Sequence, residues 1–447
     1  MIPTWSRHRE DLVALHAAAI AAADPAAAVA RALRHEGEAI RVGGRAVTLT
    51  AETRIWLVAF GKASPGMARA ALSAVGDRVA GGVIAHPHSV VRDAGLPPTI
   101  TAFAAGHPLP DAGSLAAGEA ALALLAQARP SDIVLVLVSG GGSALFEALR
   151  PGLTLADLRA VTADLQHAGA DIVELNTVRR ALSRTKGGGL ATAAGEARMI
   201  TLLLSDVIGD RVEAIASGPT VASPTSPADA LAALARRGLD TRHAAVVSAL
   251  QGAGDESGRS TRGPAPGERV IHIIGSNRTA ADALCDEARR RGFAPLLLTD
   301  RLAGEAREVG AVVGHLARGM VEGGLPLAPP ACVVLGGETT VTVRGDGSGR
   351  GGRNLELALG AAQSMAGTPR TALLSFATDG VDGSSGAAGA LVTGETMDRA
   401  TGLDLSARAA FAASDTTPFF AALGDLWVPG PSGTNVNDLV VVLAYPD

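Results

Sequence analysis

The sequence predicts an α/β fold with two domains, and three observations support this prediction. Several short apolar runs, such as Ile133–Val138, lack polar alternation, which is typical of strands buried on both faces of a parallel sheet. Segments of helical periodicity and glycine-containing turns separate these runs. The length of 447 residues and the hydrophobic content of 47% are sufficient for more than one core.

Composition and charge exclude several classes of protein. A formal net charge of −5 gives no sign of a surface that binds nucleic acid or a membrane. Two cysteines are too few for a disulfide framework or a cysteine zinc cluster, and they favour a cytoplasmic location. The amino terminus is typical of an amphipathic helix rather than a signal peptide, and no apolar run approaches the length of a membrane span.

A glycine-rich turn follows the apolar run Ile133–Val138. Glycines have no Cβ that would keep a ligand away from the backbone, and the serine after them can cap the next helix. Backbone N–H groups would then converge on an anion at the positive end of that helix. The turn matches neither the dinucleotide fingerprint nor a P-loop, and a tight turn without a ligand is the alternative. Its residues are Ser139, Gly140, Gly141, Gly142 and Ser143.

Lysine and asparagine are unusually scarce. Only Lys62 and Lys186 are lysines among 39 Lys and Arg residues, and the chain has only five asparagines. The abundance of Ala, Gly and Arg indicates a coding bias that replaces Lys and Asn wherever another residue serves. We therefore expect the remaining ones where a compact ammonium or a short amide is required, although turns and caps also retain Asn.

Lys62 occupies the kind of position at which α/β sheets bind ligands. It follows the apolar strand Ile55–Phe60 and precedes a helix. Open α/β sheets bind ligands beyond the carboxyl ends of their strands, so a phosphate or carboxylate partner is expected for Lys62. A solvated surface lysine is the alternative. Further strands at Gly82–Ala85 and Thr99–Ala105 and a helix at Leu115–Gln127 follow.

A basic segment and an aspartate complete the first domain. The run ELNTVRRALSRTKGGGLA brings together Asn176, Arg179 and Lys186, which could clamp phosphate oxygens or form part of a solvated helix face. Asp206 follows the strand Met199–Ser205. An aspartate at a strand end suits a metal contact or a general base, and helix capping is the alternative.

Two stretches predict an interdomain connection: Ser223–Pro227 and the polar run Gly252–Glu268, which is rich in Gly and Pro. We place the two domains at residues 1–245 and 246–447. The second is expected to begin with the strand Val270–Ile274, after which Asn277 stands at the strand end and a helix follows.

The second domain has its own set of polar residues at a glycine-rich loop. Glu338 follows a double glycine, and Arg353 precedes the helix Asn354–Ala361, an arrangement that suits a phosphorylated ligand. The loop Gly347–Gly352 matches G-x-G-x-x-G formally and follows an expected strand, Thr339–Arg344. A dinucleotide site is therefore an alternative, but the arginines in this loop are not part of that fingerprint.

Acidic and amide residues follow the next strand ends. Asp379 and Asp382 lie in a glycine loop after the strand Ala372–Phe376 and could hold Mg²⁺ or accept a proton, with an Asx-turn as the alternative. Asn435 and Asn437 precede the terminal strand. Lysines, arginines and aspartates at strand ends suit phosphoryl transfer, which needs charge neutralisation, Mg²⁺ and a base.

Seven motifs along the chain resemble the class II glycerate 2-kinases, whose amino-terminal domain is Rossmann-like and whose carboxy-terminal α/β domain is of the MOFRL type. They are LVSGGGSAL, LNTVRRALSRTKGG, LLLSDVIGD with ASGPTV, GSNRTAADA, GGETTVTVRG with GRGGRNLELAL, ATDGVDG and GTNVNDL. The resemblance covers nearly the whole chain and implies a MOFRL region at about 330–447. The chain departs from the family pattern at Gly189, Leu355, Ala377 and Ser385.

The resemblance implies that ATP phosphorylates D-glycerate at its 2-hydroxyl with the help of Mg²⁺. The reaction is expected in a cleft between the two domains of the chain, and the protein could be a homodimer. The family's active-site residues fall on Lys62, Asp206, Asn277, Glu338, Arg353 and Asp379. We expect Lys62, Asp206, Arg353 and Asp379 to be catalytic, and Asp206 and Asp379 to hold the metal. The expected binding residues are those of the glycine-rich turn, Asn176, Arg179, Lys186, Asn277, Glu338 and Asn435.

Three other functions remain as alternatives. Members of this family have carried the label hydroxypyruvate reductase, and the Gly347–Gly352 loop keeps a nicotinamide-dependent reductase open. A kinase for a related small hydroxy acid and a metabolite-binding protein without catalysis are the others.

Overall fold

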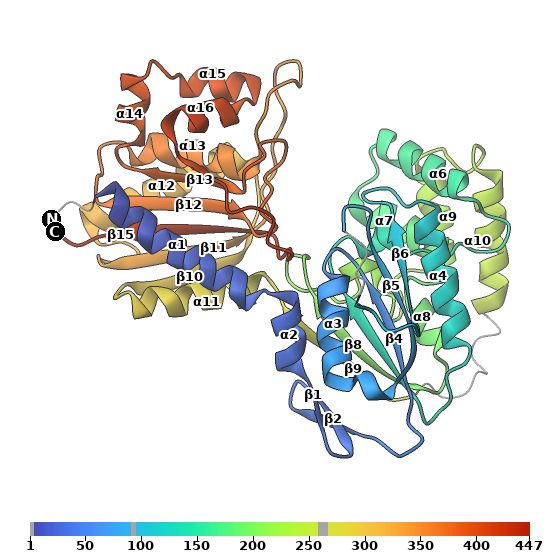
Figure 1. Cartoon of the computed structure of the whole chain (residues 1–447). Coiled ribbons are helices and arrows are strands. Elements are labelled where there is room, and N and C mark those ends of the chain that lie inside the picture. Colours follow the sequence, from blue (N-terminus) through green and yellow to red (C-terminus); the bar gives the residue numbers. More distant parts are fainter. Residues whose placement is uncertain (1–3, 91–94, 258–266) are drawn as a thin grey trace. The chain divides into compact units, whose positions relative to one another are not determined.

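The computed structural model describes residues 4–90, 95–257 and 267–447, and the chain forms two compact units (Figure 1). Unit 1 comprises Met1–Asp24, Asp206–Gly209 and Gly275–Asp447. Unit 2 comprises Pro25–Ser205 and Asp210–Ile274. This is the expected α/β class, with a parallel sheet in one unit and a mixed sheet in the other.

Unit 2 is built on a six-stranded sheet of order β6-β5-β4-β7-β8-β9. The central strands β4 (Ile55–Phe60) and β7 (Ile133–Val138) are parallel and fully buried, as their uninterrupted apolar sequences predict. Their neighbours are β5 (Val79–Pro87), β6 (Ile100–Ala105), β8 (Arg198–Leu204) and β9 (Arg269–Gly275). A small antiparallel sheet of β1 (Leu33–Glu36), β2 (Ala39–Val42) and β3 (Arg45–Thr48) belongs to the same unit.

Helices cover this sheet and form a second cluster beside it. The larger helices are α2 (Pro25–Ala32), α3 (Ser64–Val75), α4 (Ala112–Leu125), α6 (Leu155–His167), α7 (Ile172–Ala181), α9 (Pro227–Arg236) and α10 (Ala244–Ser257). Residues of α6, α7, α9 and α10, such as Val161, Val178 and Leu234, share a buried core. Asp111 caps α4 with a reciprocal bond from Ser114, which explains why the helix begins there.

The division into units differs from the expected domain boundary at residues 245 and 246. That boundary lies inside α10. The strand Val270–Ile274, which was expected to open the second domain, is β9, the edge strand of the sheet in unit 2. The amino-terminal helix α1 (Trp5–Ala22) instead belongs to unit 1, because its buried Asp11 accepts bonds from Arg291 at 2.6 Å and from the Tyr445 hydroxyl at 3.0 Å.

Unit 1 contains a six-stranded mixed sheet of order β10-β11-β15-β12-β13-β14. Its central strand β15 (Asp438–Ala444) runs antiparallel to β11 (Ala331–Gly337) and to β12 (Thr371–Ala377). The amino end of β15 therefore lies beside the carboxyl ends of both neighbours. The remaining strands are β10 (Ala294–Leu302), β13 (Gly389–Thr393) and β14 (Leu426–Trp427).

The helices of unit 1 lie on both faces of this sheet. In Figure 1, α12 (Ala306–Gly323) and α13 (Arg353–Met365) lie on one side of it, and α1 and α11 (Asn277–Arg290) lie on the other. A Cβ at Gly310 of α12 would lie 2.1 Å from the Leu357 carbonyl oxygen, so glycine permits the close approach of α12 and α13. Three short helices, α14 (Thr396–Gly402), α15 (Ala407–Ala413) and α16 (Thr416–Leu423), complete the unit.

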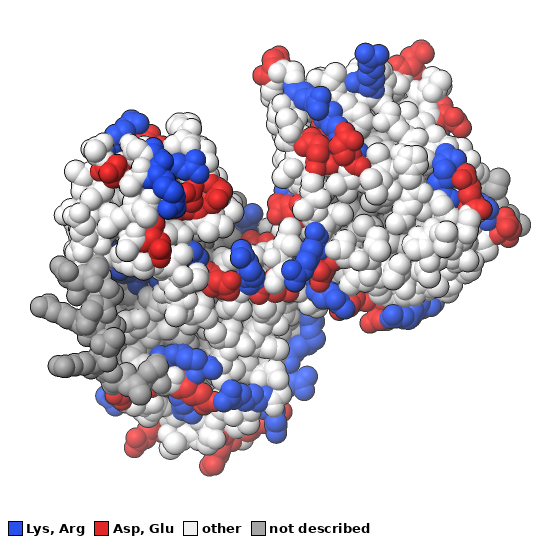
Figure 2. Space-filling view, turned by 180° about the vertical axis from the view of Figure 1, so that it is seen from behind, with Lys and Arg blue, Asp and Glu red and all other residues white. Residues whose placement is uncertain are grey.

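No single helix in the described part of the chain is long and apolar enough to cross a membrane, although the bent pair of α1 and α2 meets the criteria of length and composition. Figure 2 shows Lys and Arg side chains interspersed with Asp and Glu over one face. Among the residues drawn there, neither sign of charge forms a large continuous patch.

Asp132, directly before β7, is a buried carboxylate that links the amino ends of β4 and β7. It accepts bonds from Arg54 Nη2 at 2.7 Å, from Trp56 Nε1 at 3.0 Å and from the Arg129 backbone N–H at 2.9 Å. Burial alone would raise the pKa of Asp132, but these donors outweigh it and lower the pKa to about 2. Since the pKa in the folded state lies below the unfolded value, Asp132 stabilises the protein above about pH 4, and this contribution is lost as the pH falls towards 2.

We therefore expect Asp132→Asn to destabilise the protein by on the order of 1 to 2 kcal/mol at pH 7, a modest figure because Arg54 is partly exposed. Denaturant melts of the wild type and the variant from pH 7 to pH 2 measure the difference, which should shrink below pH 4. Asp77→Asn, at an exposed position of the same unit, is the control. A difference in stability that stays constant over this pH range would contradict the assignment.

Candidate active site

Lys62 and the glycine-rich turn lie together at one edge of unit 2. Because β4 and β7 are parallel neighbours, their carboxyl ends meet at the same edge of the sheet. The Lys62 backbone N–H donates to the Gly140 carbonyl at 2.9 Å, and the Ala63 N–H donates to the Ser139 hydroxyl at 3.0 Å. Gly61 has φ of +116°, and a Cβ there would lie 2.3 Å from Ser139 Oγ, so only glycine fits this junction.

The Lys62 side chain is a partly buried cation without a counter-charge. Within the described ranges of the chain, no hydrogen bond or ion pair engages its ammonium group. Gly141, with φ of +80°, lies beneath it, and a Cβ at Gly141 would lie 3.3 Å from Lys62 Cγ and 3.0 Å from the His107 ring. Burial and the Lys62 charge both lower the pKa of His107. The edge is therefore electropositive and open to an anion.

The expectation that Ser143 caps a helix after the turn is wrong. The helix α5 comprises only Gly142–Leu145, and the left-handed Gly141 occupies its N-cap position. Ser143 lies inside this single turn, where its hydroxyl contacts the Ser217 hydroxyl at 2.8 Å. The chain leaves the helix at Phe146, whose ring stacks on Phe60 of β4 at a centroid distance of 4.3 Å. The helix therefore has a single turn, and Phe146 directly after it packs on the central strand of the sheet.

Arg179 supplies a second cation next to the turn. Its Nη2 donates to the Ser143 carbonyl at 3.1 Å, and burial lowers its pKa although Glu147 opposes this effect. Asn176 lies three residues earlier in α7, on the same helix face, and is also partly exposed. Both residues can thus contribute to binding at this edge of unit 2.

Lys186, which the sequence places among the phosphate-binding residues, is part of a buried ion pair. Its ammonium group contacts Glu147 Oε2, and the two side chains are 2% and 0% exposed. Burial lowers the pKa of Lys186, and Glu147 opposes this shift. The Ser183 hydroxyl donates to the other carboxylate oxygen. Lys186 therefore anchors its loop in the interior, and its ammonium group does not face a ligand.

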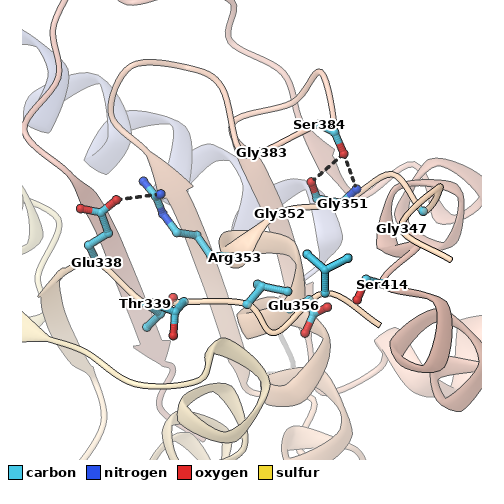
Figure 3. Close-up of a pocket in the computed structure, with 14 residues that line it drawn as sticks. Glu338, Thr339, Gly347, Gly351, Gly352, Arg353, Glu356, Gly383, Ser384 and Ser414 are labelled. Carbon is cyan, nitrogen blue, oxygen red and sulfur yellow. Dashed lines mark hydrogen bonds and ion pairs between the residues drawn. The ribbon is translucent and has the colours of Figure 1, made fainter. Parts of the chain in front are cut away.

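Arg353 is the centre of a charged cluster in unit 1. Its Nη1 contacts Glu338 Oε1 at 2.8 Å (Figure 3). Its Nη2 donates to Asp438 Oδ1 at 3.0 Å, and its Nε pairs with the other oxygen of Asp438. Asn437 Nδ2 donates to Glu338 Oε2 at 2.9 Å. Burial alone would lower the pKa of Arg353, but Asp438 and Glu338 outweigh it and raise the pKa, so the guanidinium stays charged.

Asp438 is a residue of this cluster that the sequence analysis missed. Ligand-binding residues of α/β sheets are expected after the carboxyl ends of strands, whereas Asp438 is the first residue of β15. The antiparallel register places it opposite Gly337 and Ala377, which are the last residues of β11 and β12. Burial raises the pKa of Asp438 to about 7, although Arg353 opposes the shift. The available signal is an aspartate directly before the apolar run LVVVLA in the GTNVNDL motif.

Asn277 braces the loop that precedes β15. Its Nδ2 donates to the Val436 carbonyl at 2.8 Å and to the Asp438 carbonyl at 2.9 Å. Its Oδ1 is buried against Gly336 and has no hydrogen-bond partner in the described chain. Asn435 Oδ1 accepts from the Asn437 N–H at 3.2 Å. These amides therefore shape the loop that carries Asp438, and Asn277 acts on the cluster through this backbone.

The two aspartates of the ATDGVDG loop differ in their environment. Asp379 is partly exposed, and its Oδ1 accepts from the Val381 N–H at 3.0 Å, which is the Asx-turn that the sequence left open. Asp382 is buried and caps α13, because it accepts from the backbone N–H groups of Asn354 at 3.1 Å and Leu355 at 2.9 Å. Asp382 is therefore structural, and Asp379 retains an oxygen for a ligand.

Asp206 follows β8 and is partly buried, and by its contacts it belongs to unit 1. No group of three or more His, Cys, Asp or Glu side chains suited to a metal occurs among the residues that the structure describes. Mg²⁺ needs no such cage, because it commonly binds one or two carboxylates together with substrate phosphates. The carboxylate oxygens of Asp206 and Asp379 are donors of the kind that this ion prefers.

A cavity of about 530 Å³ adjoins the charged cluster of unit 1. Figure 3 shows Glu338 and Arg353 at one end and Gly347 and Ser414 at the other. The expected strand Thr339–Arg344 is wrong, because only Thr340 forms an isolated bridge, with Glu305. The Gly347–Gly352 loop therefore lacks the preceding strand that a dinucleotide fingerprint requires.

Leu355, one of the four departures from the family pattern, is fully buried among the core side chains of unit 1. Its change from the family residue therefore concerns packing. Gly189, another of these departures, also lies in a tightly packed position. A Cβ there would lie 2.0 Å from the Arg184 carbonyl oxygen.

Two family models match the chain. The model described as a domain of unknown function (DUF4147) matches residues 11–251, and the model of the MOFRL family matches residues 331–438. Glycerate 2-kinase of Pyrococcus horikoshii is 36% identical over 95% of this chain and 94% of its own length. A protein of Agrobacterium vitis, provisionally named a hydroxypyruvate reductase, is 40% identical over 98% of this chain and 96% of its own.

A solved structure agrees with these sequence matches. The crystal structure of glycerate kinase from Thermotoga maritima has a TM-score of 0.86 and 33% identity, and the match covers 97% of this chain and 99% of that one. The two family models match separate parts of the chain, and the relatives and the shared fold extend over nearly all of it. The chain therefore belongs to the class II glycerate kinase family, whose members combine a DUF4147 region with a MOFRL region.

Proposed function

We propose that this protein is a D-glycerate 2-kinase, which transfers the γ-phosphoryl group of ATP to the 2-hydroxyl of D-glycerate. Relatives that match nearly the whole chain are named glycerate 2-kinase or glycerate kinase, and the chain retains their motifs. The two free cysteines, both buried, are consistent with action in the cytoplasm.

One observation carries this proposal furthest. Lys62 is a partly buried ammonium without a counter-charge, and it lies directly against a glycine-rich turn at the carboxyl ends of two parallel strands. A cation that no protein carboxylate neutralises is available to pair with an anionic ligand. An ammonium group beside glycines, which lack a Cβ, suits the carboxylate of a small acid or a transferring phosphoryl group. Arg179 beside the turn adds a second positive charge.

The residues of unit 1 fit the nucleotide's phosphates. Two carboxylates, Glu338 and Asp438, hold the guanidinium of Arg353 in place. Phosphate oxygens can replace Glu338 as a partner of Arg353, because the Glu338 side chain is 39% exposed and an exposed ion pair is weak. In the reaction, the 2-hydroxyl oxygen bonds to the γ-phosphorus, the bond to ADP breaks, and the hydroxyl proton passes to a carboxylate. Asp206 and Asp379 are our candidates for that base and for holding Mg²⁺, which would neutralise phosphate charge when bound.

We expect the purified protein to produce ADP from MgATP only when D-glycerate is present, and to stop when the metal is chelated. Chromatographic measurement of ADP in quenched samples, which needs no coupling enzyme and hence no metal for the readout, measures this turnover. Restoring Mg²⁺ should restore the rate, which controls for damage by the chelator. Full turnover after thorough chelation would remove the metal from the mechanism.

The same preparation distinguishes the alternatives. Incubation with hydroxypyruvate and NADH or NADPH should leave the nicotinamide unoxidised. Nicotinamide oxidation without ADP formation would identify a reductase, and ligand binding without either reaction would identify a binding protein. Faster phosphorylation of another small hydroxy acid would change the acceptor but leave the kinase assignment in place.

A further inference from the structure

The cavity of unit 1 is much larger than the acceptor substrate of the proposed reaction. Its volume of about 530 Å³ falls in the range of pockets that enclose drug-sized ligands, whereas D-glycerate is a three-carbon acid. The glycine-rich turn of unit 2 already provides the small electropositive site that such an acid requires. The size of the cavity therefore favours the larger of the two substrates.

The walls of the cavity are suited to a flat, uncharged group. They consist largely of backbone and apolar side chains, including Val341, Val343 and the glycines at 347, 349, 351 and 352. Glycines allow a planar ring to approach the backbone closely, and the exposed peptide groups can bond to the polar edge of a base. Thr339 and Ser384 add hydroxyl groups to the lining.

The charges of the lining argue against an anion deep in the cavity. Glu356 is 1% exposed, and only its Oε2 is paired, with Arg307 at 2.7 Å. Its Oε1 has no hydrogen-bond partner in the described ranges, although Ser414 lies close enough to influence its pKa. Glu338 is a second carboxylate of the lining, and Arg353 is the only cation among the lining residues. Glu338 and Asp438 already pair with Arg353, so an anionic group at that end has to displace Glu338, the more exposed of the two carboxylates. A neutral group with hydrogen-bond donors is favoured elsewhere.

We propose that this cavity binds the nucleoside part of ATP, with the phosphates directed to Arg353. Adenosine is flat at one end, carries hydroxyl and amino donors, and bears no charge. The triphosphate of ATP would lead from it to the Arg353 end of the cavity, where phosphate oxygens would replace Glu338 as partners of the guanidinium. This inference rests on the proposed kinase function, and it assigns nucleotide affinity to unit 1 and acid affinity to unit 2.

The test fills the cavity with a large side chain. Val341→Trp should raise the KM for ATP at least about tenfold, equivalent to about 1.4 kcal/mol, while the KM for D-glycerate changes less than twofold. Val343→Trp, at the same wall but 66% exposed, serves as a second variant in case Val341→Trp does not fold. Val312→Trp is the matched control, because Val312 is 68% exposed in the same unit and lies outside this cavity.

Calorimetric titration of the full chain with a non-hydrolysable ATP analogue, without glycerate, separates this inference from the kinase proposal. Binding to the wild type and to Val312→Trp, with at least tenfold weaker binding to the cavity variants, supports the inference even if no glycerate is phosphorylated. Unchanged nucleotide affinity in folded cavity variants would overturn the inference, and so would a rise in the KM for glycerate alone. Neither result would affect the kinase assignment.

Discussion

Replacing Lys62 by Ala is expected to lower kcat/KM for D-glycerate phosphorylation by at least about a hundredfold, or on the order of 3 kcal/mol of transition-state stabilisation. Removing one oriented charge or donor from an active site commonly has an effect of this size. The fold should be unaffected, because no described side chain pairs with the Lys62 ammonium group. Steady-state kinetics and thermal melts of the same preparations measure both quantities.

Lys62→Arg tests why lysine persists at this position of an arginine-rich chain. A Cβ at Gly141 would lie 3.3 Å from Lys62 Cγ and 3.0 Å from the His107 ring, so the backbone of Gly141 and the His107 ring leave little room beside the Lys62 side chain. A broad guanidinium should fit poorly, and we expect Lys62→Arg to be impaired almost as severely as Lys62→Ala. A Lys62→Arg enzyme that keeps more than about a third of the wild-type kcat/KM would make Lys62 a generic cation.

Arg353→Lys is expected to lower kcat by on the order of a hundredfold or more. Lysine keeps the positive charge but cannot bond Asp438 through two nitrogens while a third faces Glu338 or a phosphate, as Arg353 does. Some loss of stability is also expected, because Asp438 is 92% buried on its side chain and would keep only part of its pairing. The kinetic effect should exceed what partial unfolding explains.

Arg399→Lys is a matched control for that variant. Arg399 bonds the buried Asp425 through two nitrogens, at 2.9 and 3.1 Å, in the same unit, and it is exposed to a similar degree. Its replacement should reduce thermal stability about as much as Arg353→Lys and leave kcat unchanged. Equal loss of kcat in the two variants would reduce Arg353 to a structural arginine.

The sequence predicts the central strands well, because strands that are buried on both faces consist of apolar residues alone. β4 and β7 coincide with uninterrupted apolar runs, and each is followed by glycines that the backbone geometry requires. The position of Lys62 at the carboxyl end of β4 was predicted for the same reason, and its role in the site stays a prediction. These features depend on neighbours in sequence, which is why local patterns identify them.

The errors arise where contacts distant in sequence decide the outcome. Val270–Ile274 is a strand, as predicted, but only its pairing shows that it belongs to the sheet of unit 2. Lys186 could not be recognised as buried, because its partner Glu147 lies 39 positions earlier. Asp438 was missed because the direction of β15 relative to its neighbours cannot be read from the strand itself.

The most direct test of the account is the identity of the phosphorylated product. Wild-type protein incubated with MgATP and D-glycerate should give a single new phosphomonoester, and ³¹P and ¹H NMR should place the phosphate on C2. A control with Lys62→Ala under the same conditions should give little or no product. Phosphate on C3, or no phosphorylated glycerate from folded wild-type protein, would contradict the proposal that this protein is a glycerate 2-kinase.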